Sequence, residues 1–199
     1  MASQWVDERD RKFILFEVLK LNEDVLGKGM FEDHDEDMIN MILTEAAKLA
    51  ENEIAPTYPD EQHYTEGGWM ATSDSYEVGG QQLPASVSAL CANMFLSCNQ
   101  AFMMYPGLTH GSARLMEDFY HGPHRDSILE NMFSGVWAGT MCLTEPSAGT
   151  DVGMLKSTAK RNDDGSYTIT GSKSFISSGD HDLTENIIHP VLARIDGDP

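Results

Sequence analysis

The hydrophobic pattern of this chain changes its period near Gly135, and this change limits the folds that are open to it. Before Gly135, apolar residues recur every three or four positions, which is typical of amphipathic helices. After Gly135, short segments alternate apolar and polar residues, which is typical of strands that have one face on a core. The pattern therefore predicts an α+β fold in which a helical part precedes a β part.

The composition narrows the class of protein. The chain has 199 residues, 41% of them hydrophobic, which is sufficient for a packed core. Its formal charge is −19, and this argues against a nucleic-acid partner because phosphate backbones are bound mainly by Lys and Arg. A phosphate-bearing small ligand would need backbone N–H groups or a local group of cations. The nearest such group comprises Lys156, Lys160, Arg161 and Lys173.

The cysteines and the hydrophobic runs indicate the compartment. Cys91, Cys98 and Cys142 are an odd number of thiols without metal-ligand spacing, which favours a reducing environment. The first residues contain no apolar signal core, and no run approaches the length of a membrane span. We expect a soluble cytoplasmic protein.

The helical part is expected to contain several helices and one long loop. The loop covers residues 58–84, where glycine pairs break the pattern, and includes at most a short helical turn. The expected helices are residues 7–22, a helix from Asp37 that ends at Pro56 and Pro59, a helix or helix pair over 85–104, and helices over 107–120 and 123–133.

The β part is expected to begin an antiparallel meander. Its first hairpin turns at Asp163-Asp164-Gly165, a second turn falls at Gly171-Ser172, and Pro190 confines the last strand to an edge or a kink. The expected strands are residues 156–161, 166–170, 173–177 and 187–195. So few strands leave an edge and a face uncovered, so we expect a piece of a larger protein. The expected division is an N-terminal extension (1–34), a helical domain (35–135) and the first part of a β-domain (136–199).

Two segments of the β part carry a recognisable motif pair. LTEPSAGTD occupies residues 143–151, and GSKSFIS follows at 171–177, beyond the predicted hairpin. Together they resemble the paired flavin-contact signature of the acyl-CoA dehydrogenase family. The sequences of residues 12–17, 67–70 and 178–183 resemble those of the subgroup that contains 3-methylmercaptopropionyl-CoA dehydrogenases. The resemblance covers nearly the whole chain but only the front third or so of such an enzyme.

The residue types in the motif pair suit a flavin. The strand end that delivers Met141, Leu143 and Thr144 can present backbone N–H groups and a hydroxyl to the polar edge of the ring. Gly149 lacks side-chain bulk, so the backbone and the Thr150 hydroxyl can approach a pyrophosphate.

The resemblance assigns further roles in the second segment. Phe175 would pack against the flavin ring, the Ile176 backbone would flank it, and the Ser177 hydroxyl would reach its hydride-accepting nitrogen. The family commonly has Trp and Thr where this chain has Phe175 and Ser177. Ser147 would lie near the coenzyme A arm of the substrate.

The resemblance also implies an activity, a cofactor and partners. Members use FAD to convert an acyl-CoA thioester to a trans-2-enoyl-CoA, as in the catabolism of fatty acids or methylthio-acyl groups. Their catalytic glutamate lies in a C-terminal helical bundle, so we expect the base beyond Pro199 and an inactive fragment. An electron-transfer flavoprotein or similar acceptor and a homo-oligomer are expected. Two alternatives stay open: acyl-CoA oxidase or flavin monooxygenase chemistry on the same fold, and a non-catalytic truncated paralogue that serves as a binding or dimerisation module.

Other residues are better explained by structural roles. Glu145 precedes the turn proline and is expected to accept structural hydrogen bonds rather than to act as a base. His121 and His124, near Asp118, lack a further ligand, so no metal is expected. The methionines of the helical part favour core packing over a pocket wall; they are Met94, Met103, Met104 and Met116. Tyr105-Pro106-Gly107 is expected to interrupt the helices and form a loop.

Overall fold

The computed structural model describes residues 7–55 and 61–197. Its helices are α1 (Glu8–Lys12) with the π-helical continuation η1 (Phe13–Val18), α2 (Leu21–Asp24), α3 (Glu36–Leu49) with its continuation η3 (Ala50–Ile54), α4 (Glu61–Glu66), α5 (Ala85–Cys98), α6 (Gln100–Phe119) and α7 (Arg125–Phe133). Single 3₁₀ turns are η2 (Gly29–Phe31), η4 (Trp69–Ala71), η5 (Tyr76–Val78) and η6 (Val152–Met154). The strands are β1 (Trp137–Gly139), β2 (Thr158–Arg161), β3 (Tyr167–Thr170), β4 (Asn186–Ile188) and β5 (Arg194–Ile195).

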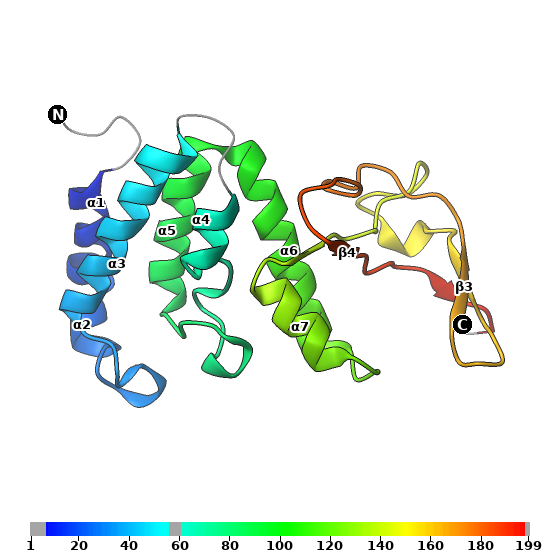
Figure 1. Cartoon of the computed structure of the whole chain (residues 1–199), viewed down its shortest axis with the longest axis horizontal. Helices are drawn as coiled ribbons and strands as arrows, with labels where there is room; N and C mark the ends of the chain where they lie inside the picture. The colour runs from blue at the N-terminus through cyan, green and yellow to red at the C-terminus, as the bar shows by residue number, and fades with distance from the viewer. Residues whose placement is uncertain (1–6, 56–60, 198–199) are drawn as a thin grey trace.

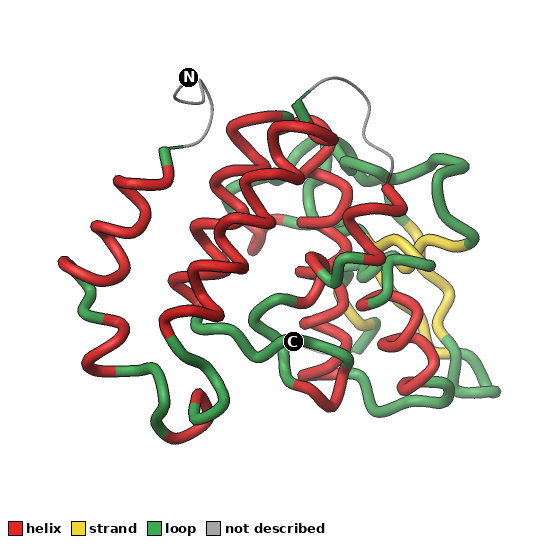
Figure 2. Tube along the Cα trace, turned by 60° about the vertical axis from the view of Figure 1, so that its left-hand side comes forward, coloured by secondary structure: helices red, strands yellow, loops and turns green. Residues whose placement is uncertain are grey.

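The helices lie side by side, and the strands lie at the opposite end of the molecule from α1 (Figure 1). The view in Figure 2 shows the same separation, with the strands on the side away from α1. This arrangement and the matches described below confirm the predicted α+β class, with helices first and strands second.

The predicted helices form where side chains cap their ends and one face is buried. Asp35 caps α3 by accepting the Met38 N–H at 2.8 Å, and Asn99 caps α6 by accepting the Phe102 N–H at 3.1 Å. The helix predicted over residues 7–22 is interrupted at Lys20, which has a φ of 49°. The expected loop contains α4 and two 3₁₀ turns, whereas Pro56 and Pro59 lie outside the described residues.

The expected interruption at Pro106 was wrong. Helix α6 runs for 20 residues and contains Pro106 in its interior. Proline removes one backbone hydrogen bond at this position. The face of α6 that contains Pro106 is buried, and this burial offsets the lost hydrogen bond. The buried face comprises Phe102, Met103, Pro106, Thr109, Ser112 and Ala113.

Two hydrophobic clusters hold the helical part together. The larger one joins η1, α3, α4, α5 and the start of α6, and Met94 and Met103 belong to it. The smaller one lies between α6 and α7, where Trp137 and Ile188 of the neighbouring strands pack against it with Met116. Met104 is 45% exposed. The role of core filler is thus confirmed for three of the four methionines.

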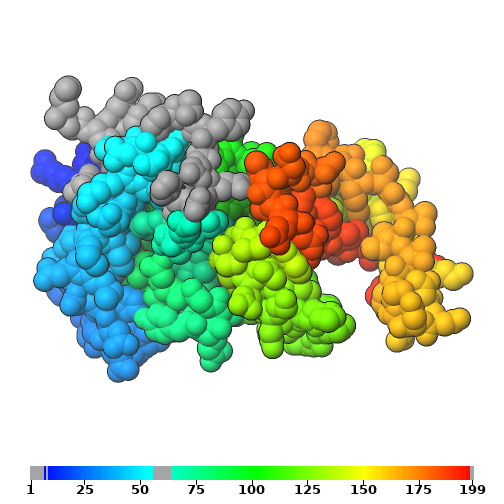
Figure 3. Space-filling model, viewed as in Figure 1, coloured from blue at the N-terminus to red at the C-terminus, as the bar shows by residue number. Residues whose placement is uncertain are grey.

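The strands form two small sheets. β2 and β3 are an antiparallel hairpin, as predicted, whose tip is closed by the bond from Gly165 N–H to the Asn162 carbonyl at 3.1 Å. β1 pairs with β4, and β2 with β5, in parallel. The strand predicted over residues 173–177 was wrong: Phe175 has a φ of 59°, which no strand residue adopts. The β2–β3 hairpin stands apart from α7 in the space-filling view (Figure 3).

Among residues 7–55 and 61–197, no helix combines the length and the apolar character that a bilayer crossing requires.

Candidate functional site

The first motif segment begins on a strand that is fixed tightly to the helices. The Gly139 N–H donates to Thr109 Oγ1 of α6 at 3.0 Å. A Cβ at Gly139 would lie 2.6 Å from Ser112 Cβ and 2.7 Å from Met132 Cε, so only glycine allows this approach. Thr140 is fully buried, and its hydroxyl shares a hydrogen bond of 2.7 Å with His189 Nδ1. The position of β1 is therefore set by α6, α7 and the segment that follows β4.

Beyond β1, every second backbone N–H group continues to pair with the segment that follows β4. The N–H groups of Thr140 and Cys142 donate to the carbonyls of Ile188 and Pro190, at 3.0 and 2.9 Å. The intervening residues, Met141 and Leu143, point their N–H groups to the opposite side, and neither finds an acceptor within residues 7–55 and 61–197. Among the described residues, these two N–H donors are therefore unpaired, although the Leu143 carbonyl accepts a hydrogen bond from Lys173.

The motif turns sharply at its proline. The Glu145 N–H donates to the Ala148 carbonyl at 2.8 Å, and the Ala148 N–H donates back to the Glu145 carbonyl at 3.1 Å. Glu145 and Ala148 are buried, whereas Pro146 and Ser147 are exposed at the tip. The turn thus places Ser147, the predicted substrate contact, on the surface.

Glu145 is the internal anchor of this turn. Its carboxylate accepts the N–H groups of Lys156 and Ser157 at 2.7 and 3.0 Å, and the Lys173 ammonium at 2.9 Å. Hydrogen bonds from Ser157, Lys156 and Lys173 lower the pKa of the Glu145 carboxyl to about 2. A carboxylate held in this way is a poor proton acceptor. The expected structural role of Glu145 is therefore confirmed.

Lys173 joins the two motif segments. Its ammonium also donates to the Leu143 carbonyl at 3.0 Å, and its side chain is only 13% exposed. The next residue, Ser174, donates its N–H to the Thr144 carbonyl at 2.9 Å. The sequence grouped Lys173 with the cations available for phosphate, and this assignment was wrong because its charge is paired with Glu145. Lys156, Lys160 and Arg161 are exposed.

The second segment carries an aromatic ring on the surface. Phe175 is 92% exposed and has a φ of 59°, and Ser178 has a φ of 56°. Bulky residues rarely adopt positive φ, and such conformations cluster at ligand sites. Nearby, Gly171 passes so close to Ser157 that an added Cβ would lie 2.1 Å from Ser157 Oγ. The segment is thus held against the first one while Phe175 projects outward.

The residues predicted to contact the flavin come from both motif segments, which lie next to each other in the structure. Ile176 and Ser177 are half-buried, as are Leu143 and Thr144, whereas Met141, Gly149 and Thr150 are exposed. A Cβ at Gly149 would meet no atom closer than Thr144 Cγ2, at 3.9 Å. The space beside Gly149 is therefore not required for packing within the chain. The individual ligand contacts of these residues remain predictions.

Among the described residues, no group of three His, Cys, Asp or Glu side chains is placed to hold a metal ion.

Comparison with known proteins identifies the region. Residues 140–194 match the family model described as "Acyl-CoA dehydrogenase, middle domain". The chain is 40% identical over 131 residues to 3-methylmercaptopropionyl-CoA dehydrogenase of Ruegeria pomeroyi, a match that covers 66% of this chain and 22% of that protein. It is 34% identical over 216 aligned positions to the broad-specificity linear acyl-CoA dehydrogenase FadE5 of Mycobacterium tuberculosis, covering 95% of this chain and 34% of that protein.

A solved structure agrees with the sequence matches. The acyl-CoA dehydrogenase of Bacillus anthracis, solved as a complex with FAD, superposes with a TM-score of 0.67 at 26% identity. The superposition covers 84% of this chain and 30% of that one. The chain thus spans between about a fifth and a third of the length of these proteins. It is similar in sequence and in fold to the acyl-CoA dehydrogenases, and residues 140–194 match the model of their middle domain.

Proposed function

We propose that this chain forms the N-terminal helical part and the flavin-contact part of an FAD-dependent enzyme that dehydrogenates acyl-CoA thioesters. The observation that carries the proposal is the joining of the two motif segments. The bond from Ser174 N–H to the Thr144 carbonyl and the Lys173 bridge hold them together across the hairpin. Three related proteins that carry the acyl-CoA dehydrogenase name support the reaction class.

The donors and the ring on this face fit FAD. A flavin presents carbonyl and ring-nitrogen acceptors along one edge, and the unpaired N–H groups of Met141 and Leu143 would meet acceptors of this kind. The exposed ring of Phe175 offers an aromatic face for packing against a planar heterocycle. The open space beside Gly149 would accommodate the pyrophosphate. FAD supplies the hydride acceptor for the α,β-dehydrogenation.

The residues of this chain would then bind and orient rather than transfer protons. Thr144 and Ser177 would hold the ring edge through their hydroxyls, and Ser147 at the exposed tip would approach the coenzyme A arm. Glu145 keeps the turn in place through its three hydrogen bonds. The acceptor of the substrate proton is assigned to none of the described residues. A cytoplasmic location, an electron-transfer flavoprotein partner and self-association belong to the proposal as well.

Flavin retention tests the assigned contacts. We expect Thr144→Ala combined with Ser177→Ala to weaken FAD binding, because two hydrogen bonds of about 0.5–1.5 kcal/mol each correspond to roughly a 5-fold to 150-fold loss. The measurement is the visible absorbance of the purified protein that carries these residues, titrated with FAD and then with butyryl-CoA. Thr170→Ala, on the exposed face of the hairpin, is the matched control.

Two outcomes would count against the proposal. Equal FAD affinity in the double variant and the control would remove the assigned contacts. In a full-length protein that includes the expected C-terminal base, retained flavin that neither butyryl-CoA nor other acyl-CoAs bleach would remove the substrate class while leaving the cofactor assignment in place.

A further inference from the structure

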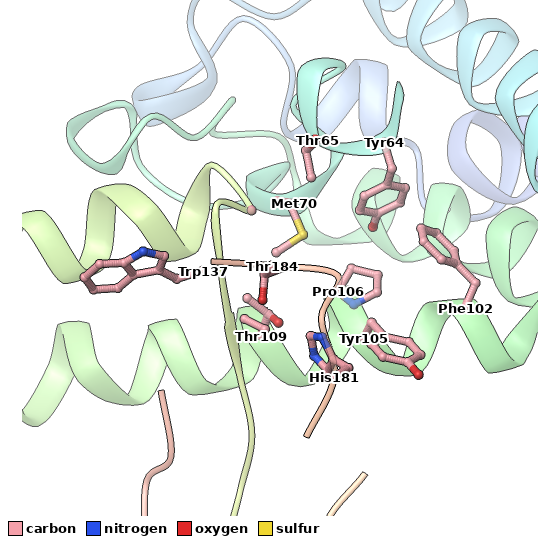
Figure 4. A pocket seen from close by; sticks show the side chains of 12 residues that line it. Tyr64, Thr65, Met70, Phe102, Tyr105, Pro106, Thr109, Trp137, His181 and Thr184 are labelled. Atoms are coloured by element: carbon pink, nitrogen blue, oxygen red, sulfur yellow. The ribbon is translucent and has the colours of Figure 1, made fainter. Parts of the chain in front are cut away.

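A small pocket lies where the helical part meets the segment after the second motif. Its volume is about 30 Å³, and α4, α6, the start of β1 and the loop around His181 form its walls. Figure 4 shows the side chains around it, with His181 beside Tyr105 and Thr184 above Thr109. The lining is mainly apolar and includes Tyr64, Met70, Phe102, Pro106 and Trp137. The residues assigned to flavin contact do not line it.

His181 lines this pocket and carries a buried ring nitrogen. The Leu183 N–H donates to His181 Nδ1 at 3.3 Å, and a nitrogen that accepts carries no proton. The ring proton therefore lies on Nε2. The ring is held in place by an edge-to-face contact with Tyr105, with the ring centroids 5.3 Å apart. Nε2 is buried and has no hydrogen-bond partner within residues 7–55 and 61–197.

Three other polar side chains of the lining are already engaged. Thr109 Oγ1 accepts the Gly139 N–H, Thr184 Oγ1 donates to the Asn186 carbonyl at 3.1 Å, and the Tyr64 hydroxyl donates to the Trp69 carbonyl at 3.3 Å. Burial raises the pKa of Tyr64, so its hydroxyl keeps its proton. Of the lining's buried side-chain nitrogen and oxygen atoms, within the described chain, His181 Nε2 alone lacks a partner.

We propose that this pocket is a binding site for a small uncharged hydrogen-bond acceptor, such as the carbonyl or ether oxygen at the end of a short aliphatic chain. A buried donor without an acceptor is costly, so a ligand that accepts from Nε2 gains by satisfying it. The lining contains no Asp, Glu, Lys or Arg, which disfavours a carboxylate or phosphate because a buried charge needs a partner. The volume admits only a few heavy atoms, since a water needs about 10–15 Å³ on this measure.

The test uses two probes of the same shape. Acetone carries an acceptor oxygen, and isobutene replaces that oxygen with a methylene group. With the protein labelled at the histidine ring nitrogens, we expect acetone to shift the His181 Nε2 resonance in a saturable manner and isobutene to leave it unchanged. This comparison uses the unaltered protein, so it does not depend on the folding of a variant. It also requires no flavin and no turnover, so it stands independently of the proposed dehydrogenase function.

A variant then assigns the contact. His181→Phe keeps the aromatic contact with Tyr105 but removes the donor, and we expect acetone to bind about two- to tenfold more weakly, the range of one neutral hydrogen bond. His121→Phe, at an exposed position outside the pocket, should bind acetone as the unaltered protein does. Identical responses to both probes, or undiminished acetone binding by a folded His181→Phe variant, would overturn the assignment. So would an Nε2 resonance that acetone does not move.

Discussion

Gly139→Ala should destabilise the protein by driving β1 away from the helices. The added methyl group would lie 2.6 Å from Ser112 Cβ, whereas carbon atoms in contact prefer about 3.5–4.0 Å. Ser112 Cβ is bonded directly to the backbone of α6, so it cannot move aside as the end of a side chain does. Met132 Cε, at 2.7 Å, can adjust more easily. The strand must therefore shift by roughly 1 Å, and overpacking of this kind costs about 1–3 kcal/mol.

Thermal unfolding measures this cost directly. For a chain of this size, each 1 kcal/mol corresponds to roughly 2–4 °C, so the melting temperature followed by circular dichroism should fall by about 2–12 °C. Gly149→Ala is the matched control, because its added Cβ meets nothing closer than 3.9 Å and should leave the melting temperature unchanged. An equal effect of the two substitutions would refute the packing argument.

Two further predictions concern Glu145 and helix α6. The folded-state pKa of Glu145 is lowered from 4.5 to about 2, so the stabilisation from this carboxylate is fully present above about pH 4.5 and is lost as the pH falls through about 2. Urea unfolding followed across this range should therefore show a smaller loss of stability in Glu145→Gln than in the unaltered protein, and parallel curves would contradict the assigned bonds. Gly111→Ala, within α6, should stabilise the protein by about 0.5–1 kcal/mol, because its Cβ meets nothing within 4 Å and alanine favours a helix; a lower melting temperature would contradict this.

The helices could be predicted because their signals are local. The spacing of apolar residues in α3 and α7 and the prolines and glycines near their ends indicate both elements without knowledge of the fold. Pro106 misled the prediction because the sequence shows the missing N–H but not the burial that outweighs it. The parallel pairings of β4 and β5 could not be predicted, since their partners lie 30 or more residues away along the chain.

The candidate site was likewise predictable from the sequence only in part. The motif pair predicted that two separated segments meet, and the bond between Ser174 and Thr144 confirms their proximity. The Glu145–Lys173 pair was beyond prediction as a pair, because nothing local indicates which of 13 basic side chains meets a given carboxylate. The positive φ of Phe175 could not be predicted either, because the residues around this phenylalanine have the composition of an ordinary strand.

The hydrogen bonds of Glu145 fix the base of the β2–β3 hairpin beside the motif segments. Its carboxylate binds the chain at Ser157, where the chain leaves for β2, and at Lys173, where it has returned from β3. Between these two points β2 also pairs with β5, so only the tip of the hairpin, residues 162–166, lies beyond the paired strands. This tip can lengthen, shorten or carry an inserted peptide while the paired strands keep their geometry, so it is the natural place to attach a label without disturbing the two motif segments.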